Sequence, residues 1–264
     1  MHRTADIQKR PHHFLPANFE LTQWESLEPY FKALLDRKIT NKLTLESWMQ
    51  DLSELEAFVS EDACWRQIKM TCDTTDKSLE AAFTFFCMEI QPKMQPYADA
   101  LNKKLIQSPY TAGLDQAKYH TYLRSVKKSI ELFRTENIPI QAELSVLQQQ
   151  YGVIAGKMTI EVGGKEYTLQ QAAQFLENED RAFREEVYRK IQTRRLQDQE
   201  AMHDLFTNLV QKRHQVALNA GFENYRDYKF AELGRFDYTK EDCFQFHDAV
   251  KLHVMPLIEK IYTR

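Results

Sequence analysis

The histidines are the first candidates for metal chemistry, because imidazole is a common zinc ligand. A helix presents two histidines to one zinc ion when they are four residues apart, as in His-Glu-x-x-His, and the sequence contains no such motif. Glu200-x-x-His203 matches half of a di-iron carboxylate motif, but that site also requires a second Glu-x-x-His and two further carboxylates. His247 and His253 are six residues apart, on different sides of a helix. We therefore expect no metal-ligating residue in this chain.

The possible nucleophiles also lack the partners that their chemistry requires. Ser125-x-x-Lys128 has the spacing of the nucleophile in penicillin-recognising enzymes, yet the companion motifs Ser-Asp-Asn and Lys-Thr-Gly are absent. Cys64 and Cys72 alone cannot complete a four-ligand zinc site, so we interpret them as buried packing residues. The glycine-rich phosphate-binding motifs and the Gly-x-Ser-x-Gly motif of hydrolases are absent as well. No catalytic, cofactor-binding or metal-ligating residue is assigned.

Composition limits the partners and the compartment. The formal net charge of −3 gives no basic surplus for nucleic acid. No stretch approaches 18 uncharged apolar residues, so we expect no membrane partner. The sequence opens without an apolar run, and its four cysteines form no Cys-x-x-Cys motif. This pattern is typical of reduced, mostly buried thiols in a cytoplasmic protein.

The elements that would position any site are predicted to be helices. Seven glycines in 264 residues is a low content, which indicates few turns and long elements. Trp48, Leu52, Leu55 and Val59 recur at helical spacing and define an amphipathic core helix. A polar stretch at 193–200 predicts a bend or a solvated break in a helical tract that ends at Gly221. We expect helices to be capped at their amino-terminal ends by Ser26, Thr44, Thr75 or Asp76, Asp115, Asn178 and Thr239.

The periodicity changes over about 157–169, where apolar and polar residues alternate around Gly163-Gly164. A Gly-Gly pair suits a two-residue hairpin turn, in which both residues have positive φ. Closing this turn pairs Val162 with Lys165, Ile160 with Tyr167 and Met158 with Leu169. Thr168-x-x-Gln171 is a capping box that returns the chain to helix. The predicted fold class is therefore mainly α, with one small β-hairpin.

The last predicted helix keeps its apolar stripe to the end of the sequence at Arg264. We expect from this that the natural protein continues. We also expect Pro256 to bend this helix, and Leu257, Ile261 and Tyr262 to be exposed because they lack neighbours.

Several segments together resemble oligoendopeptidase F-like zinc metallopeptidases, which are relatives of thimet oligopeptidase. Trp48-Met-Gln-Asp-Leu-Ser-Glu-Leu-Glu-Ala57, Glu61-Asp-Ala-Cys-Trp-Arg66 and Met70-Thr-Cys-Asp-Thr-Thr-Asp76 are similar to the amino-terminal lobe of that family. The hairpin followed by Asn178-Glu-Asp-Arg-Ala-Phe-Arg-Glu-Glu-Val-Tyr188 resembles the family's hairpin and its Asp-Arg-x-x-Arg helix. Arg213-x-x-x-Ala-x-x-x-Gly-Phe-x-x-Tyr225 is similar to another stretch of the family.

The resemblance implies a multi-helix lobe of a clamshell peptidase that cuts short peptides. Such enzymes hold zinc through His-Glu-x-x-His and a later Glu, and the glutamate of the motif is general base to the metal-bound water. That motif lies downstream of the region matched here, so no zinc ligand or base is carried over to any residue of this sequence. The resemblance therefore implies a full-length zinc peptidase with peptide substrates, and a 264-residue chain that binds no zinc and is inactive alone.

Two organisational questions stay open at this point. The alternative function is a complete, non-enzymatic helical scaffold that binds a peptide or a protein partner, and the absence of catalytic motifs favours it. A reading frame that continues past Arg264 into His-Glu-x-x-His would favour the peptidase, and a stop codon there would favour the scaffold. We divide the chain into an amino-terminal helical region, 1–110, and a helical region with the hairpin, 111–264, that leads towards an absent catalytic domain.

Overall fold

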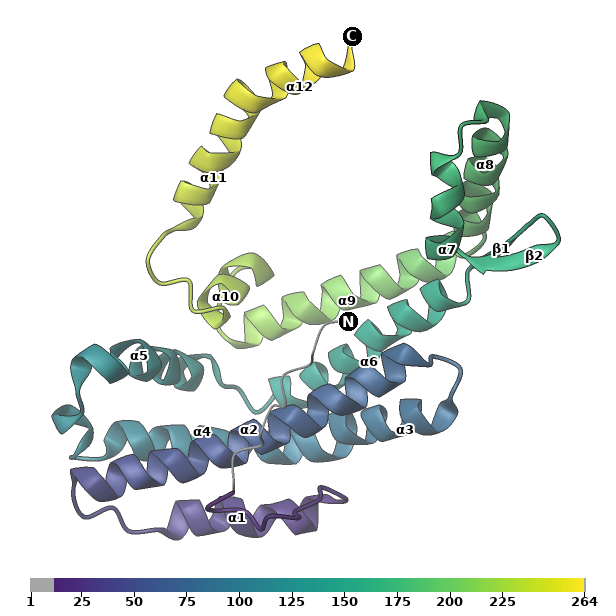
Figure 1. Ribbon diagram of the computed structural model, residues 1–264. Helices are drawn as coiled ribbons and strands as arrows, with labels where there is room; N and C mark the ends of the chain where they lie inside the picture. Colours follow the sequence, from purple (N-terminus) through teal and green to yellow (C-terminus); the bar gives the residue numbers. More distant parts are fainter. Residues whose placement is uncertain (1–11, 264) are drawn as a thin grey trace, which may run out of the picture.

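The computed structural model describes residues 12–263, and helices dominate it (Figure 1). The first half contains α1 (Trp24–Asp36), α2 (Lys42–Cys72), α3 (Lys77–Phe85), the π-helical segment η1 (Phe86–Ile90), α4 (Gln91–Gln107), the short η2 (Thr111–Gly113) and α5 (Gln116–Leu132). Then follow α6 (Asn137–Gly156), strands β1 (Thr159–Val162) and β2 (Lys165–Thr168), α7 (Leu169–Ala173), η3 (Gln174–Glu177), α8 (Arg181–Gln197) and α9 (Gln199–Asn219). The chain ends with α10 (Tyr225–Glu232), α11 (Lys240–Ala249), the π-helical η4 (Val250–Val254) and α12 (Met255–Tyr262).

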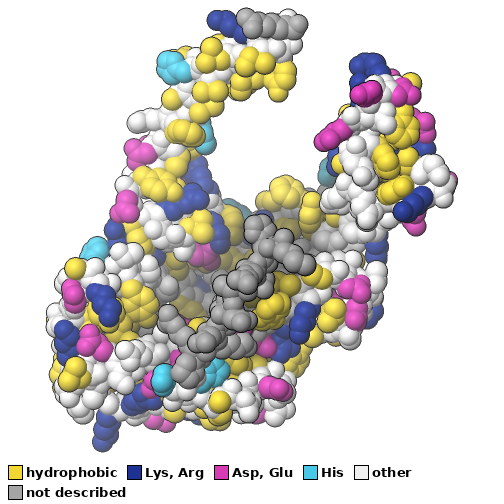
Figure 2. Space-filling model, viewed as in Figure 1, with side chains coloured by type: hydrophobic (Ala, Val, Ile, Leu, Met, Phe, Trp, Pro, Cys, Tyr) yellow, Lys and Arg dark blue, Asp and Glu magenta, His cyan; other side chains and the backbone are white. Residues whose placement is uncertain are grey.

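The elements form a helical body with two projections (Figures 1 and 2). Helices α1 to α5 pack together in the body, and the long helices α6 and α9 lie side by side above them. The hairpin, α7 and α8 form one projection, and α11, η4 and α12 form the other, with an opening between them. The predicted mainly α fold with one hairpin is confirmed. None of the described helices is long and apolar enough to cross a membrane.

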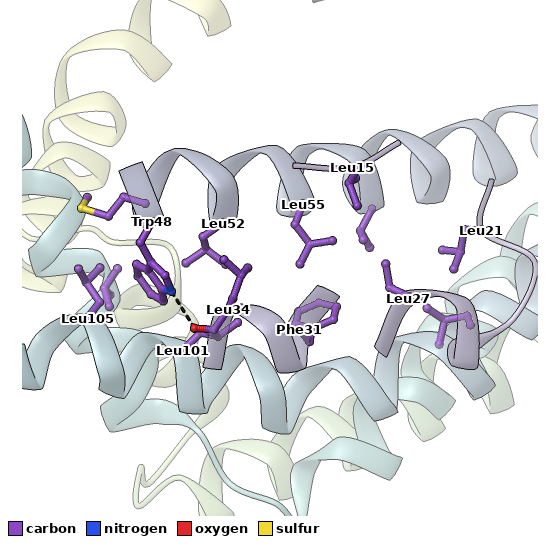
Figure 3. Packing of buried hydrophobic residues seen from close by; sticks show 14 of the residues in the cluster. Leu15, Leu21, Leu27, Phe31, Leu34, Trp48, Leu52, Leu55, Leu101 and Leu105 are labelled. Atoms are coloured by element: carbon purple, nitrogen blue, oxygen red, sulfur yellow. Dashed lines mark hydrogen bonds between the residues drawn. The ribbon is translucent and has the colours of Figure 1, made fainter. Parts of the chain in front are cut away.

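Apolar side chains bury themselves in three clusters. The largest joins α1, α2, η1, α4 and α5, and Trp48 lies fully buried in it beside Leu52 and Leu105 (Figure 3). A second cluster joins α6, α9 and α10, and a third holds the hairpin against α7 and α8. The predicted stripe of Trp48, Leu52, Leu55 and Val59 is buried as expected for an amphipathic core helix.

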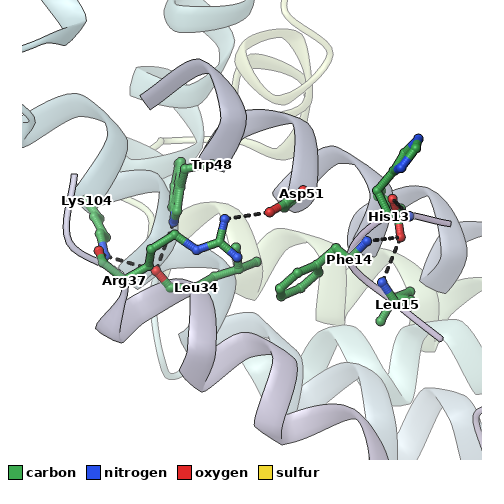
Figure 4. Close-up of polar contacts among 9 residues, drawn as sticks. His13, Phe14, Leu15, Leu34, Arg37, Trp48, Asp51 and Lys104 are labelled. Atoms are coloured by element: carbon green, nitrogen blue, oxygen red, sulfur yellow. Dashed lines mark hydrogen bonds and ion pairs between the residues drawn. The ribbon is translucent and has the colours of Figure 1, made fainter. Parts of the chain in front are cut away.

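Polar contacts fix the carboxyl end of α1 and the segment that precedes this helix (Figure 4). The Lys104 ammonium group donates hydrogen bonds of 2.9, 2.6 and 2.6 Å to the carbonyl oxygens of Leu34, Leu35 and Arg37. These carbonyls lie at the carboxyl end of α1, where no helical donor remains and where a cation is favourable. The Glu54 carboxylate accepts hydrogen bonds from the backbone amides of residues 13, 14 and 15, at 2.8, 3.0 and 2.8 Å.

The hairpin agrees with its sequence pattern at the turn. Gly163 and Gly164 have φ of +61° and +76°, and Val162 pairs with Lys165 and Ile160 with Tyr167 in an antiparallel ladder. The predicted pairing of Met158 with Leu169 is wrong, because the ladder ends at Thr159–Thr168 and Leu169 already begins α7. The Thr168 capping box is confirmed, since the Gln171 side chain accepts from the Thr168 amide and the Thr168 hydroxyl accepts from the Gln171 amide.

Three of the predicted helix starts are wrong. Gln23 precedes α1, and Ser26 lies inside the first turn, where its hydroxyl donates to the Gln23 carbonyl. Asn41 caps α2, and Thr44 is the third residue of its capping box. Asp180 caps α8, whereas the side chain of Asn178, two residues earlier, accepts a hydrogen bond from the Asp180 amide. In α2 and α8 a neighbouring polar residue makes the capping contact, whereas Gln23 precedes α1 without a side-chain capping hydrogen bond.

The other predicted ends are confirmed. Asp76, Asp115 and Thr239 cap α3, α5 and α11 through their side chains. The helical tract breaks at Asp198, between α8 and α9, within the polar stretch identified in the sequence. Gly221 has φ of +86° and ends α9, and the Phe222 amide donates to the Ala217 carbonyl across the turn.

The helix that contains Pro256 changes its winding before that proline. The π-helical turn η4 precedes Met255-Pro256, and η1 likewise precedes Gln91-Pro92. A proline in a regular helix loses a hydrogen bond and clashes with the carbonyl four residues earlier, and a wider turn accommodates it. Leu257, Ile261 and Tyr262 are 58%, 70% and 85% exposed, so their predicted exposure is confirmed.

Candidate functional site

An apolar groove runs between α2 and α6, over a floor formed by α3, η1 and α4. Its cavity volume is about 650 Å³, within the range of small-molecule and peptide sites. We call it the α2–α6 groove and define it by its apolar lining residues, which include Leu52, Val59, Met70, Phe83, Phe86, Cys87, Met94 and Tyr151. The buried stripe of α2 forms one wall, because Leu52 and Val59 lie near the edge of the main core.

The charge in the α2–α6 groove is acidic. Glu56 and Glu80 line it, and within the described part of the chain, residues 12–263, no lysine, arginine or histidine does so. Glu80 is paired with Lys77 at 2.6 Å. Glu56 is exposed to solvent on one side. The protein atoms packed around its carboxyl group desolvate that group, and this desolvation raises its pKa. Desolvation, with the charge of Glu56, raises the pKa of Tyr122 on α5 to about 12.

The groove also offers hydrogen-bond acceptors. The Gln149 Oε1 atom is buried and has no hydrogen-bond partner within residues 12–263. Gly152, one turn along the same helix, leaves open space where a Cβ atom would otherwise lie. An apolar groove with a free acceptor and a carboxylate is suited to a ligand that carries apolar groups and N–H donors.

Cys87 lies at the floor of the α2–α6 groove and is buried, as predicted for the thiols. Burial raises the pKa of this thiol to about 11. Cys64 and Cys72 are exposed on α2, so their interpretation as buried packing residues is wrong. The apolar stripe of α2 ends at Val59 except for Met70, and the last turns of the helix therefore present most side chains to solvent.

The structure does not assemble the sequence motifs considered first. Lys128 forms an ion pair with Glu131, and Ser125 is exposed nearby on α5. His203 lines a second cavity beside α9, which Glu200 does not line. His247 on α11 and His253 in η4 are exposed. Within the described part of the chain, no three or more His, Cys, Asp or Glu residues gather in a group that could hold a metal ion.

Sequence reasoning missed Glu56, the most perturbed acidic residue of the groove. It lies between Leu55 and Ala57 on an amphipathic helix, where a glutamate has the appearance of a solvated surface residue. Its desolvation arises from the packing of elements that are distant in sequence, which line the groove with it. No local pattern could have identified it.

Comparison with protein families gives two matches along the chain. Residues 14–133 match the peptidase M3 N-terminal domain, and residues 174–264 match peptidase family M3. No curated protein matches the sequence significantly.

Solved structures share the fold. PZ peptidase A, determined with an inhibitor, superposes with a TM-score of 0.86 at 23% identity, covering 92% of this chain and 43% of its own. A protein assigned as oligoendopeptidase F gives 0.87 at 24% identity, covering 93% of this chain and 44% of its own. A second such protein, from Bacillus anthracis str. Ames, gives 0.84 at 20% identity, covering 97% of this chain and 45% of its own. The chain thus spans less than half the length of these three proteins.

Proposed function

The chain belongs to peptidase family M3, and from this premise we propose that it is the amino-terminal lobe of a zinc-dependent oligopeptidase that hydrolyses short peptides. The observation that supports the proposal is the order of the two family segments, with the N-terminal domain at 14–133 and part of the peptidase domain at 174–264. The shared fold over 43–45% of three longer proteins is consistent with it.

Zinc belongs to the whole protein in this proposal. A catalytic zinc site needs three protein ligands and a water, and the metal then polarises the scissile carbonyl and activates that water. The residues of this chain do not fit such a site, because residues 12–263 contain no suitable group of ligands and the sequence has no His-Glu-x-x-His. We therefore propose that the chain alone is inactive.

The experiment compares the 264-residue chain with the product of the whole gene. Each is dialysed, analysed for zinc and assayed on an internally quenched peptide, with and without a chelator. We expect about one zinc per molecule and chelator-sensitive cleavage only for the whole protein. The proposal is overturned if the 264-residue chain cleaves the peptide in a chelator-sensitive way, or if the whole protein does not.

A matched control tests the nearest metal-like motif of the chain. His203 is the histidine that follows a glutamate by three residues, so His203→Ala removes the best donor pair of the sequence. Zinc content that falls in this variant would contradict the proposal, since we expect the 264-residue chain and its variant to be equally free of zinc.

The alternative function is a non-enzymatic helical scaffold that binds a peptide or a protein partner. The α2–α6 groove, at about 650 Å³ and with mostly apolar walls, is the feature that favours it. A gene whose reading frame lacks His-Glu-x-x-His would support this alternative and exclude the peptidase.

We also propose a cytoplasmic location and two regions, 1–110 and 111–264. The location is supported by four free cysteines, Cys64, Cys72, Cys87 and Cys243, as expected in a reducing compartment.

The division into regions 1–110 and 111–264 is tested by limited proteolysis. Early cleavage near residue 110 is expected, and protection of that segment would contradict the division.

A further inference from the structure

A second cavity, of about 940 Å³, lies where α6, α7, α8 and α9 meet. We call it the α9 groove, because residues of α9 between Gln199 and Arg213 line it along that helix. Its walls include Leu196 and Phe206, which are 65% and 64% exposed. Figure 2 shows hydrophobic side chains gathered over α9, at the base of the opening between the two projections. Large apolar groups exposed together in a groove are typical of a binding surface.

The charge in the α9 groove is basic. Arg195, Arg213 and His203 line it, and no aspartate or glutamate among residues 12–263 does. The acidic residues that α9 carries near this end, Glu200 and Asp204, lie outside the lining. The α9 groove is therefore suited to an anionic group.

The adjacent basic residues differ from these two arginines in their partners. Arg194 forms an ion pair with Asp198, and Lys212 forms one with Glu143. Over residues 12–263, no ion pair joins the guanidinium groups of Arg195 and Arg213 to an acidic residue, and the Arg213 guanidinium lies 5.9 Å from the centroid of the Tyr225 ring. Two unpaired guanidinium groups in an apolar groove can make charge-assisted hydrogen bonds with incoming carboxylates.

The two grooves meet on α6 and have opposite charge. Gln148 and Tyr151 line both, and they form the ridge of α6 that separates the acidic α2–α6 groove from the basic α9 groove. An anionic ligand is therefore favoured on one side of this ridge and disfavoured on the other.

We propose that the α9 groove binds a short, extended acidic peptide, with carboxylates that reach Arg195 and Arg213 and apolar side chains between them. The length of the groove supports this choice. From Gln199 to Arg213 a helix rises about 21 Å, at 1.5 Å per residue, and an extended chain of about six residues spans that distance at about 3.3 Å per residue. Leu196 and Phe206 provide the contact surface for the apolar side chains.

The test measures binding to the 264-residue chain by isothermal titration calorimetry. The probes are two peptides blocked at both ends, Asp-Leu-Phe-Leu-Phe-Asp and Asn-Leu-Phe-Leu-Phe-Asn. We expect the acidic peptide to bind at least about tenfold more tightly, and the difference to shrink as salt is added. Arg195→Gln and Arg213→Gln should each weaken its binding about fivefold, and the double variant should bind both peptides equally.

The control is Arg189→Gln, which changes an exposed arginine of α8 that is paired with Glu185. It should leave binding of the acidic peptide unchanged, and circular dichroism should show that all variants are folded. The proposal is overturned if the two peptides bind equally, or if a peptide with lysine at both ends binds as tightly as the acidic peptide. It is also overturned if the control variant loses as much binding as the Arg195 and Arg213 variants. A dimer that the arginine variants dissociate would overturn it in favour of a second copy. Because no cleavage is measured, failure of the proposed peptidase activity would leave this result unaffected.

Discussion

The Trp48 indole donates a hydrogen bond of 2.9 Å to the carbonyl oxygen of Leu34, and this contact joins the core of α2 to the end of α1. The Leu34 carbonyl also accepts from Lys104 on α4, so three helices meet at one backbone oxygen. Both Trp48 and Leu34 are fully buried. The contact is thus made away from water, where a lost partner is costly to replace.

Trp48→Phe should destabilise the protein by about 2–4 kcal/mol. The change removes a buried hydrogen bond and leaves a cavity in the main core. Urea unfolding followed by circular dichroism measures the change in the free energy of unfolding. Trp65→Phe is the matched control on the same helix, because Trp65 is 52% exposed, and it should cost less than about 0.5 kcal/mol. Equal losses in the two variants would contradict the assigned role of Trp48.

Glu54 should make stability depend on pH in the acid range. Burial acts to raise the pKa of this carboxyl, but hydrogen bonds from three backbone amides outweigh it and hold the pKa below its ordinary value of 4.5. A depressed pKa stabilises the fold above 4.5, and this contribution is lost as the pH falls through the lowered value. Glu54→Gln should therefore cost about 1 kcal/mol at pH 7 and flatten the decline in stability below pH 4.5. A variant of the exposed Glu136, Glu136→Gln, should keep the parent profile, and an unchanged profile for Glu54→Gln would refute the assignment.

The glycines of the hairpin turn should resist substitution because of backbone conformation alone. An added Cβ at Gly163 or Gly164 meets no atom within 4 Å, but both residues have positive φ. Gly163→Val and Gly164→Val should each cost about 1–2 kcal/mol in thermal or urea unfolding. Gly113→Val is the control, since Gly113 has equally open space without positive φ. Turn variants as stable as this control would be inconsistent with the hairpin.

The four thiols should react with a maleimide in a defined order. Cys64 and Cys72 are exposed and should be labelled first, and Cys243 should follow because it is partly buried. Cys87 should react only after denaturation, because it is buried and its pKa of about 11 keeps it protonated at pH 8. Mass spectrometry of peptides at successive times gives the order. Early labelling of Cys87 would contradict its placement at the floor of the α2–α6 groove.

The exposed apolar residues of α12 should contribute little to the stability of this chain. Leu257→Gln and Ile261→Gln should change the free energy of unfolding by less than about 0.5 kcal/mol, since both side chains are more than half exposed. Leu55→Ala, at a fully buried position, should cost about 2–5 kcal/mol in the same assay. Losses of similar size at both kinds of position would show that α12 packs against the body in solution.

Local patterns predicted the elements but not all of their boundaries. The Gly163-Gly164 turn and the Thr168 capping box involve residues close in sequence, and both were correctly predicted. The sequence pattern predicts the start of α2 at Thr44, whereas Asn41 caps the helix. The capping contact is reciprocal, so Asn41 and Thr44 give the same local signal. A choice between two such residues depends on backbone dihedral angles, which the sequence does not specify.

The grooves could not be predicted, because their walls come from segments far apart in the chain. Glu56 and Gln149 both line the α2–α6 groove, and Tyr151 and Phe206 both line the α9 groove. Hydrophobic periodicity reports which face of a helix is apolar, but not which other helix covers that face. The exposure of Cys64 and Cys72 has the same cause, since the tertiary packing of α2 leaves these two positions uncovered.

In the projection formed by α11, η4 and α12, a small rotation at the base produces a large displacement at the far end. The projection follows the short segment 233–239 after α10, and near its base Lys240 forms an ion pair of 3.3 Å with Asp227, while the Arg226 guanidinium lies 5.6 Å from the centroid of the Phe244 ring. The projection has no buried residue in α11, η4 or α12. Its 23 residues from Lys240 to Tyr262 reach about 34 Å at a helical rise of 1.5 Å per residue. A rotation of about 10° at that segment would therefore displace Tyr262 by about 6 Å, an arc that follows from the same helical length. Small torsional changes at that segment therefore become large displacements at Tyr262, and they are opposed by the contacts of Arg124 with Phe236 and Asp237 and of Lys240 with Asp227.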